Sequence, residues 1–277
     1  MKIEQPEVTG YVDLPGDNAV HLWILDLTRP EVCHLQDDSL LLTEQEWLRA
    51  ARRAVPSDRI RFKLARTLVR SVLSHYCPTV APLDWEFRTS GHGKPEISDP
   101  CLTRPVYFNV SHARQRLVMA VSHWPAIGVD VEWADPARDV EGIASRYFTQ
   151  DELFFLGDLA PASRLAGFYT LWTLKEAFSK SRGLALVPAL RDVSFRMTGK
   201  SGLAAAIRER PDRGNLSGDS WQFWSYLDDS YLLAVALNRG RDEQAGIRSR
   251  CLPRQVWNPL APGQWQESGI VLHRHSG

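Results

Sequence analysis

The sequence predicts an α+β protein in which helices alternate with short strands and strand hairpins. A long helix is indicated at residues 168–180, where large apolar side chains recur at three- and four-residue steps: Phe168, Leu171, Trp172 and Phe178. Strands are indicated by runs rich in valine, isoleucine and aromatic residues. Two of these runs, 221–226 and 231–237, are separated by a short polar turn, as in a β-hairpin. Gly183 follows the long helix and suits its C-terminal cap.

Cap and turn signals predict the remaining elements. Thr43 with Glu46, and Thr149 with Glu152, form the capping-box pattern that opens a helix. The first of these helices should end before Pro56, and another should follow it directly. The remaining predicted strands cover residues 20–27, 84–87, 106–112, 117–122, 127–132 and 193–197.

Length and composition are those of a globular protein with a full core. The chain has 277 residues, of which 44% are hydrophobic and 24% charged, enough for one large or two small domains. The formal net charge is zero, so any site for a polyanion must come from local clustering. The four cysteines show no Cys-x-x-Cys spacing, which favours a reducing compartment over a zinc site or a disulfide framework. Because the sequence has neither a signal-peptide pattern nor an apolar run long enough to span a bilayer, we expect a cytoplasmic protein.

Three carboxylates are the strongest candidates for chemistry. Asp130 and Glu132 are two residues apart on the predicted strand 127–132, so they should project from the same face. Two like charges side by side must be solvated, partly protonated or neutralised by a cation. With Glu176 from the long helix, they would supply the oxygen ligands that Mg²⁺ prefers. The alternatives are a solvated strand end for the Asp-x-Glu pair and an exposed i,i+4 ion pair between Glu176 and Lys180.

A basic run precedes these motifs. Within residues 49–70 there are eight cationic side chains and a single carboxylate, Asp58. Such a run is often a solvated helix face, and the alternative is an anion site for phosphate or for an acidic partner surface. The eight cations are Arg49, Arg52, Arg53, Arg59, Arg61, Lys63, Arg66 and Arg70.

Two further segments suit contacts to a phosphate or a nucleotide base. Ser111 and His112 are adjacent on a predicted strand and should face opposite sides, so they are poorly placed to act as a hydrolase dyad. Lys94 follows a glycine-containing stretch, 91–93, in which the backbone can approach a ligand closely. A plain turn before a strand explains the same stretch.

Five motifs occur in the order and spacing of a known family. They are Gly93-Lys94-Pro95, Phe108-Asn109-Val110-Ser111-His112, Gly128-Val129-Asp130-Val131-Glu132, Arg146-Tyr147-Phe148 with Glu152, and Trp172-Thr173-Leu174-Lys175-Glu176-Ala177-Phe178-Ser179-Lys180. Within roughly residues 40–237, the chain resembles the 4'-phosphopantetheinyl transferase superfamily. Its two-half length resembles the Sfp-type branch, the monomeric enzymes that activate polyketide and nonribosomal peptide carriers, rather than the short trimeric holo-carrier-protein synthases.

The resemblance implies two similar α+β subdomains related by a pseudo-twofold axis, each a small, mainly antiparallel sheet packed with helices. The N-terminal subdomain would cover residues 1–126 and the C-terminal subdomain residues 127–239, followed by a C-terminal extension at 240–277. Coenzyme A and Mg²⁺ would lie in the cleft between the subdomains.

The resemblance also implies roles for individual residues. Asp130, Glu132 and Glu176 match the metal ligands, with the metal bridging the pyrophosphate of coenzyme A. Lys175 and Lys180 match lysines that contact this pyrophosphate and, with Glu176, would form the catalytic group. The positions that match contacts to the adenosine end and its 3'-phosphate are Lys94, Ser111, His112, Arg61, Arg49 and Arg53.

The implied reaction is attack of a carrier-protein serine on the β-phosphorus of coenzyme A, with release of 3',5'-ADP. Mg²⁺ and the lysines would neutralise the developing charge, and either Glu176 or a metal-bound water would take the serine proton. The implied partners are coenzyme A and an apo acyl or peptidyl carrier protein, without nucleic acid or membrane. The rival hypotheses are a Mg²⁺-dependent hydrolase of nucleotide diphosphates and a binding protein that docks carrier domains without catalysis. The sequence does not fix which fatty acid, polyketide, peptide or siderophore pathway is served.

Overall fold

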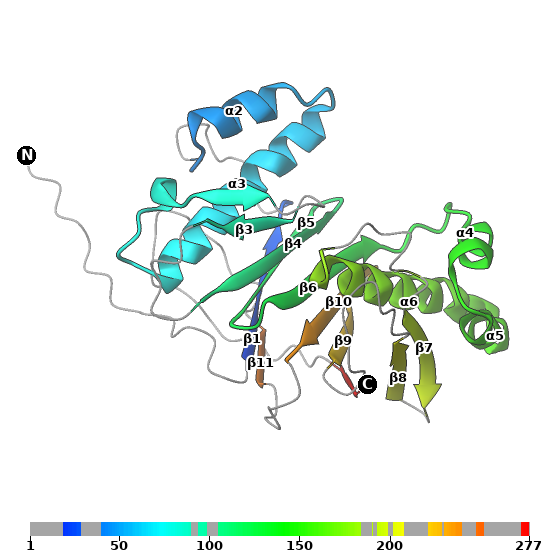
Figure 1. Cartoon of the computed structure of the whole chain (residues 1–277). Coiled ribbons are helices and arrows are strands. Elements are labelled where there is room, and N and C mark those ends of the chain that lie inside the picture. Colours follow the sequence, from blue (N-terminus) through cyan, green and yellow to red (C-terminus); the bar gives the residue numbers. More distant parts are fainter. Residues whose placement is uncertain are drawn as a thin grey trace, which may run out of the picture.

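Two four-stranded sheets and two 21-residue helices make up most of the fold in a computed structural model of the chain (Figure 1). The structure describes residues 19–28, 40–89, 94–98, 105–183, 190, 193–198, 202–207, 221–228, 230–239, 248–251 and 273–276. The first sheet has the strand order β11 (Arg248–Cys251), β1 (Ala19–Asp26), β5 (Arg116–Ser122) and β4 (Tyr107–Ala113). The second has the order β12 (His273–Ser276), β9 (Trp221–Asp228), β10 (Tyr231–Asn238) and β6 (Ala126–Trp133). All neighbouring strands in both sheets are antiparallel except β11, which runs parallel to β1.

The helices and two small hairpins complete the described part of the chain. The hairpins are β2 (Phe87–Thr89) with β3 (Pro95–Ile97), and β7 (Val193–Thr198) with β8 (Gly202–Ile207). The helices are α2 (Glu44–Ala51), α3 (Pro56–Tyr76), α4 (Val140–Tyr147), α5 (Gln150–Asp158) and α6 (Pro161–Ser181). Both predicted capping boxes are present, at the starts of α2 and α5. Gly183, with φ 58°, follows α6 in the left-handed conformation expected of a residue beyond a helix end.

Each sheet is covered by one long helix, and the two sheets share a third apolar core. Side chains of α3 and the first sheet, such as Leu68 and Met119, form one cluster. Side chains of α6 and the second sheet, such as Phe178 and Phe223, form another. The alternate strand residues, among them Val118, meet in the cluster between the sheets. The predicted α+β fold is confirmed, and the matched halves fit the pseudo-twofold arrangement.

The two sheets join where β4 and β6 lie side by side as edge strands. The side-chain oxygen of Asn109 accepts a hydrogen bond from the Val129 amide at 2.9 Å. Two residues further on, the Ser111 hydroxyl accepts one from the Val131 amide at 3.3 Å. β6 is an edge strand among the described residues, so its amides on this side have no strand partner. Side chains of β4 bind them instead.

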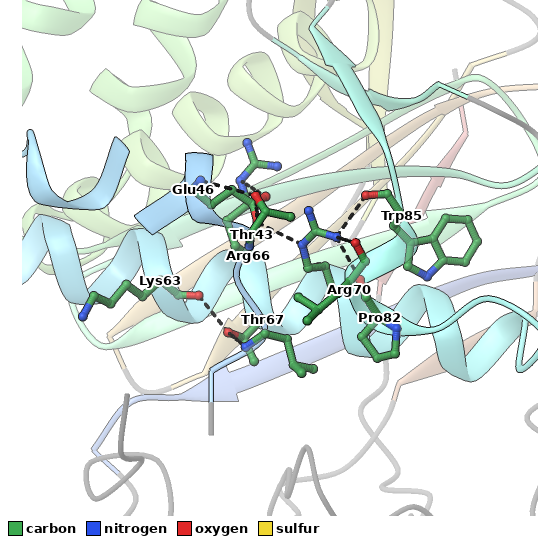
Figure 2. A network of polar contacts seen from close by, with 10 residues as sticks. Thr43, Glu46, Lys63, Arg66, Thr67, Arg70, Pro82 and Trp85 are labelled. Carbon is green, nitrogen blue, oxygen red and sulfur yellow. Dashed lines mark hydrogen bonds and ion pairs between the residues drawn. The ribbon is translucent and has the colours of Figure 1, made fainter. Parts of the chain in front are cut away.

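A buried arginine anchors α2 and the turn after α3 to α3 itself (Figure 2). Arg70, only 3% exposed, donates to Glu46 Oε2 at 3.0 Å and to the carbonyl oxygens of Pro82 at 2.8 Å and Trp85 at 3.0 Å. Burying a charge requires this degree of pairing. The prediction of a strand at 84–87 is therefore wrong for residues 84–86, because the carbonyl groups around Pro82–Asp84 turn toward Arg70 in a 3₁₀ helix and the strand starts only at Phe87.

Both described parts of the C-terminal stretch form edge strands. β11 pairs with β1 of the first sheet, and β12 pairs with β9 of the second. The expected boundary between residues 126 and 127 coincides with the start of β6, and the division into subdomains stays a prediction. No helix in the described ranges has the length and apolar character needed to cross a bilayer.

Candidate active site

Helix α6 approaches strand β6 closely because residue 128 has no side chain. A Cβ atom at Gly128 would lie 2.0 Å from the backbone oxygen of Ala177, so any other residue would push the helix away. Alternate residues of a strand face the same side, so Asp130 and Glu132 face α6 together with Gly128. Figure 1 shows α6 lying against β6. The close contact brings carboxylates of the strand against polar side chains of the helix, such as Asp130 against Lys180.

Asp130 is the buried centre of this group. Its carboxylate is 3% exposed, and Oδ1 accepts hydrogen bonds from Lys180 Nζ at 2.6 Å and from the Ser111 hydroxyl at 2.8 Å. Lys180 also donates to the Ser111 hydroxyl at 2.8 Å, and 30% of its side chain remains exposed. Burial alone would lower the pKa of Lys180, but Asp130 and Glu176 overcome this effect and raise that pKa. Lys180 is therefore a fixed cation with one side open.

Burial, and after it the negative charge of Asp130, raises the pKa of both Glu132 and Glu176. Burial, followed by Asp130 and Glu132, raises the pKa of Glu176 to about 8, against an ordinary value of 4.5. Burial and then Asp130 raise the pKa of Glu132 as well. Arg138 offsets part of this repulsion, since its Nη1 lies 3.9 Å from Glu132 Oε1. Three carboxylates thus share one region whose cations do not fully neutralise them.

The donor set fits a hard divalent cation, although it is not preassembled. Within the described part of the chain, no three His, Cys, Asp or Glu side chains are grouped tightly enough to hold a metal ion. Asp130 Oδ2, however, is buried and has no hydrogen-bond partner. A buried carboxylate oxygen without a partner beside two carboxylates of raised pKa is the arrangement that a metal ion would relieve. Carboxylate oxygens are also the ligands that Mg²⁺ prefers.

Lys175 does not join this site. Its side chain is fully buried, and its ammonium group donates to the carbonyl oxygens of Leu190 at 2.8 Å and Val193 at 2.7 Å. It also pairs at 3.0 Å with Glu152, which is fully buried and closes the capping box of α5. All three N–H donors are used, so Lys175 has no free donor for a pyrophosphate. Helix α6 is buried on nearly all sides of this segment, so Lys175 is enclosed together with the apolar side chains around it.

A basic groove of about 410 Å³ lies beside the carboxylates. Arg53, Arg61 and Arg66 from the region of α3 line it opposite Ser111 and His112 of β4. The Nε atom of Arg61 is buried without a hydrogen-bond partner, although its Nη2 binds the Asp58 carboxylate. An unused guanidinium donor among several cations suits an anionic ligand.

The two side chains of β4 contribute to the groove differently. His112 is exposed, and desolvation together with Arg61 and Lys180 lowers its pKa, so it is held neutral beside the cations. Ser111 is buried, and its hydroxyl is bonded to Asp130 and Lys180. The two side chains therefore face opposite sides, as the strand period predicts.

Two residues expected to bind the donor lie outside the groove lining. Arg49 is exposed on α2 and is not among the described residues that line the groove. Lys94 lines a neighbouring cavity of about 380 Å³ and donates to the carbonyl oxygens of Ile127 at 3.0 Å and Pro125 at 3.5 Å. Burial lowers the pKa of Lys94 to about 8. The glycines before it lie outside the described residues.

Two cations near the site were not selected from the sequence. Arg66 belongs to the basic run, and its ion pair with Glu46 at 3.6 Å, which holds it against α2, is not signalled by the sequence (Figure 2). Arg138 belongs to a polar segment without periodicity, and its guanidinium lies 5.4 Å from the centre of the Trp172 ring. No pattern in the chain signals that contact.

The fold and the site define an α+β protein with two four-stranded sheets, a carboxylate cluster where β6 meets α6, and a basic groove lined by α3 and β4. The profile of the 4'-phosphopantetheinyl transferase superfamily matches residues 126–236. Over 179 residues the chain is 35% identical to the 4'-phosphopantetheinyl transferase HetI of Nostoc sp., covering 65% of this chain and 74% of that protein. The chain belongs to the 4'-phosphopantetheinyl transferase superfamily, and it is an enzyme of the transferase class.

Two other relatives extend the comparison. A putative 4'-phosphopantetheinyl transferase of Synechocystis sp. is 28% identical over 251 residues, which cover 88% of this chain and 94% of that protein. The 4'-phosphopantetheinyl transferase Sfp of Bacillus subtilis is 34% identical over 140 residues, which cover 50% of this chain and 59% of that protein. The similarity thus includes an Sfp-type enzyme, as the motifs predict.

Proposed function

We propose that the protein is a Mg²⁺-dependent transferase that moves 4'-phosphopantetheine from coenzyme A to a serine of an apo acyl or peptidyl carrier protein and releases 3',5'-ADP. The observation that carries this proposal is the meeting of Asp130, Glu132, Glu176 and Lys180 where β6 and α6 touch. Acidic groups for a metal and a basic group for a phosphate lie there together. This is the combination that transfer from a pyrophosphate requires.

The basic groove supplies a site for the phosphorylated adenosine end of the donor. Arg53, Arg61 and Arg66 would bind the 3'-phosphate, and neutral His112 would contribute a hydrogen bond. Lys94 would contact the adenosine end only by leaving its two carbonyl partners. Arg49 would act at longer range, since its charge lies near Arg66 and helps to lower the pKa of that residue.

Side chains of β6 and α6 would perform the transfer. The serine oxygen of the carrier forms a bond to the β-phosphorus of coenzyme A, and the bond from this phosphorus to the leaving oxygen of 3',5'-ADP breaks. Lys180, with its open side, would bind the pyrophosphate oxygens on which negative charge grows. Asp130, Glu132 and Glu176 would hold Mg²⁺, which when bound polarises the phosphoryl oxygens.

The serine proton also needs an acceptor. Glu176 or a metal-bound water would take it. In the metal-free protein the pKa of Glu176 is about 8, so this side chain would accept a proton only after the charge of the metal has favoured its ionised form. Lys175 has no part in the proposed chemistry, because its donors are all used in the fold.

The test is incubation with a panel of apo carrier proteins, coenzyme A and Mg²⁺, followed by mass spectrometry of each carrier. Addition of phosphopantetheine to at least one carrier, and its loss when EDTA replaces Mg²⁺, is the expected result. Consumption of coenzyme A without carrier modification would identify a hydrolase instead. Carrier binding without either change would identify a docking protein. We also propose that the enzyme is a monomer that acts in the cytoplasm on soluble partners, and a sizing column run on the same preparations tests the oligomeric state.

A further inference from the structure

Ser111 makes a set of contacts that a simple ligand-binding serine does not need. It lies on β4 at the junction of the two sheets and is 5% exposed. Its hydroxyl donates to Asp130 Oδ1 at 2.8 Å and accepts hydrogen bonds from the Val131 amide at 3.3 Å and from Lys180 Nζ at 2.8 Å. A hydroxyl group has one donor and two acceptor positions, so all three are used.

These contacts leave the two oxygens of Asp130 in different states. Oδ1 is held by the Ser111 hydroxyl and the Lys180 ammonium, whereas Oδ2 is buried with no partner. Leaving a buried carboxylate oxygen unpaired is costly, and in a native protein it points to a missing ligand. One oxygen therefore fixes the orientation of the carboxylate, and the other is presented to whatever binds there.

We infer that Ser111 is a positioning residue for Asp130, which orients Oδ2 toward the divalent cation, and that it does not contact the 3'-phosphate of coenzyme A. The inference deepens the proposed function and rests on it, because it names how the cation site is held. Both halves of the protein then build the site: the first sheet supplies the hydroxyl that orients a ligand of the second. Groups that orient metal ligands through hydrogen bonds typically contribute 10–100-fold to metal affinity.

The neighbouring Asn109 offers a matched control. It also binds an amide of β6 from β4, but the hydrogen bond that its side-chain oxygen accepts comes from Val129 and does not involve Asp130. If bridging the two sheets were all that Ser111 does, loss of either side chain should have the same consequence.

Direct binding of Mn²⁺, followed by electron paramagnetic resonance in the absence of a carrier, tests the inference without turnover. We expect Ser111→Ala to bind Mn²⁺ about 10–100-fold more weakly than wild type, Ser111→Thr to restore most of the affinity, and Asn109→Ala to stay within about twofold. Equal affinity in wild type and Ser111→Ala would overturn the inference. Absence of Mn²⁺ binding to wild type, with or without coenzyme A, would instead overturn the proposed metal site.

Donor kinetics separate the two roles of Ser111 further. 3'-Dephospho-coenzyme A lacks the 3'-phosphate. Mutation of a residue that binds only this phosphate should therefore not slow transfer from that donor. We expect the rate defect of Ser111→Ala to be the same fold-change with both donors and to shrink as Mg²⁺ is raised, while the defect of Arg61→Ala disappears with the dephospho donor. A Ser111→Ala defect that disappears with the dephospho donor would contradict the inference.

Substitute variants cover the case in which one of these proteins does not fold. Ser111→Cys, whose thiol is a weak donor, replaces Ser111→Ala. Ser111→Thr, which keeps the hydroxyl group, replaces Asn109→Ala as the control.

Discussion

Two lysines of helix α6 pair with carboxylates, yet their surroundings differ in every respect that matters for function. Lys175 and Glu152 are both fully buried, and the lysine also binds two carbonyl oxygens. Lys180 and Asp130 form a pair with one open side, because Lys180 is 30% exposed and Asp130 Oδ2 has no partner. The first pair is complete, because all N–H donors of the lysine have partners within the protein. In the second pair, a carboxylate oxygen still lacks a hydrogen-bond partner, which a ligand would supply.

The pKa values of the two lysines follow this division. Burial lowers the pKa of Lys175 despite its carboxylate partner, whereas Asp130 and Glu176 raise the pKa of Lys180 despite its burial. An excess of negative charge therefore surrounds Lys180 and a balanced set surrounds Lys175. The lesson is that satisfaction of donors and acceptors, rather than burial or residue type, separates a structural ion pair from a functional one in this helix.

The largest expected effect comes from breaking the complete pair. Lys175→Met leaves the Glu152 carboxylate and two carbonyl oxygens without their partner in a dry site, so we expect the free energy of unfolding to fall by about 3–5 kcal/mol. Urea unfolding followed by fluorescence measures this change. The double variant Lys175→Met with Glu152→Gln should recover part of the loss, because no charge is then stranded. A Lys175→Met protein as stable as wild type but inactive would reverse the assignment of the two lysines.

Lys180→Met should reduce the rate of transfer more than it reduces stability. We expect the rate of transfer to fall about a hundred-fold, because a fixed positive charge at the reacting phosphate is lost, while stability changes much less than in Lys175→Met. Single-turnover kinetics at saturating coenzyme A, run beside urea unfolding on the same preparations, give both numbers. A full rate in Lys180→Met would remove this residue from the chemistry.

The groove allows a smaller, more specific test. Arg66 lines it and Arg49 does not, although both are arginines of the same basic region. Hydrogen bonds to charged groups contribute about 1.5–3 kcal/mol, so Arg66→Ala should raise the KM for coenzyme A about tenfold or more. Arg49→Ala should raise it less than threefold. An equal rise in KM in the two variants would show that coenzyme A binding depends on the overall positive charge of the region and not on contacts within the groove.

The most gradual expected effect is a pH dependence of stability, because it is spread over several pH units. The folded, metal-free protein keeps a proton on Glu176 up to a pKa of about 8, whereas the unfolded chain loses it near 4.5. Because the folded state then binds more protons, this carboxyl group makes the free energy of unfolding fall as the pH rises from about 4.5 to 8 and level off above. Urea unfolding at several pH values in EDTA measures the slope, and Glu176→Gln should flatten it. An unchanged slope in that variant would exclude Glu176 as its source.

Much of the fold and part of the site could be predicted from the sequence. Strand alternation and two capping boxes indicate β6, α2 and α5 correctly, since those signals are local. Asp130 and Glu132 could be assigned to one face by the same alternation. Their meeting with Glu176 depends on the resemblance to a family, because no local pattern shows that α6 crosses β6 at Gly128.

The errors have physical causes as well. The resemblance implies that Lys175 contacts the pyrophosphate, and helical periodicity could not show that this lysine is enclosed, because α6 is buried on nearly all sides there. The predicted strand at 84–87 failed because Arg70, distant in sequence, binds the carbonyl groups there. Arg138 was missed because it lies in a polar segment without periodicity and its contact with the Trp172 ring is long-range.

The most direct test of the account is transfer to an apo carrier protein by Glu176→Ala, measured by mass spectrometry at saturating coenzyme A and Mg²⁺. The account predicts a loss of at least about a hundred-fold in rate, with a free energy of unfolding close to that of wild type because removal of Glu176 leaves no buried charge without its partner. Near-normal transfer by this variant would contradict the carboxylate site between β6 and α6 as the centre of the reaction.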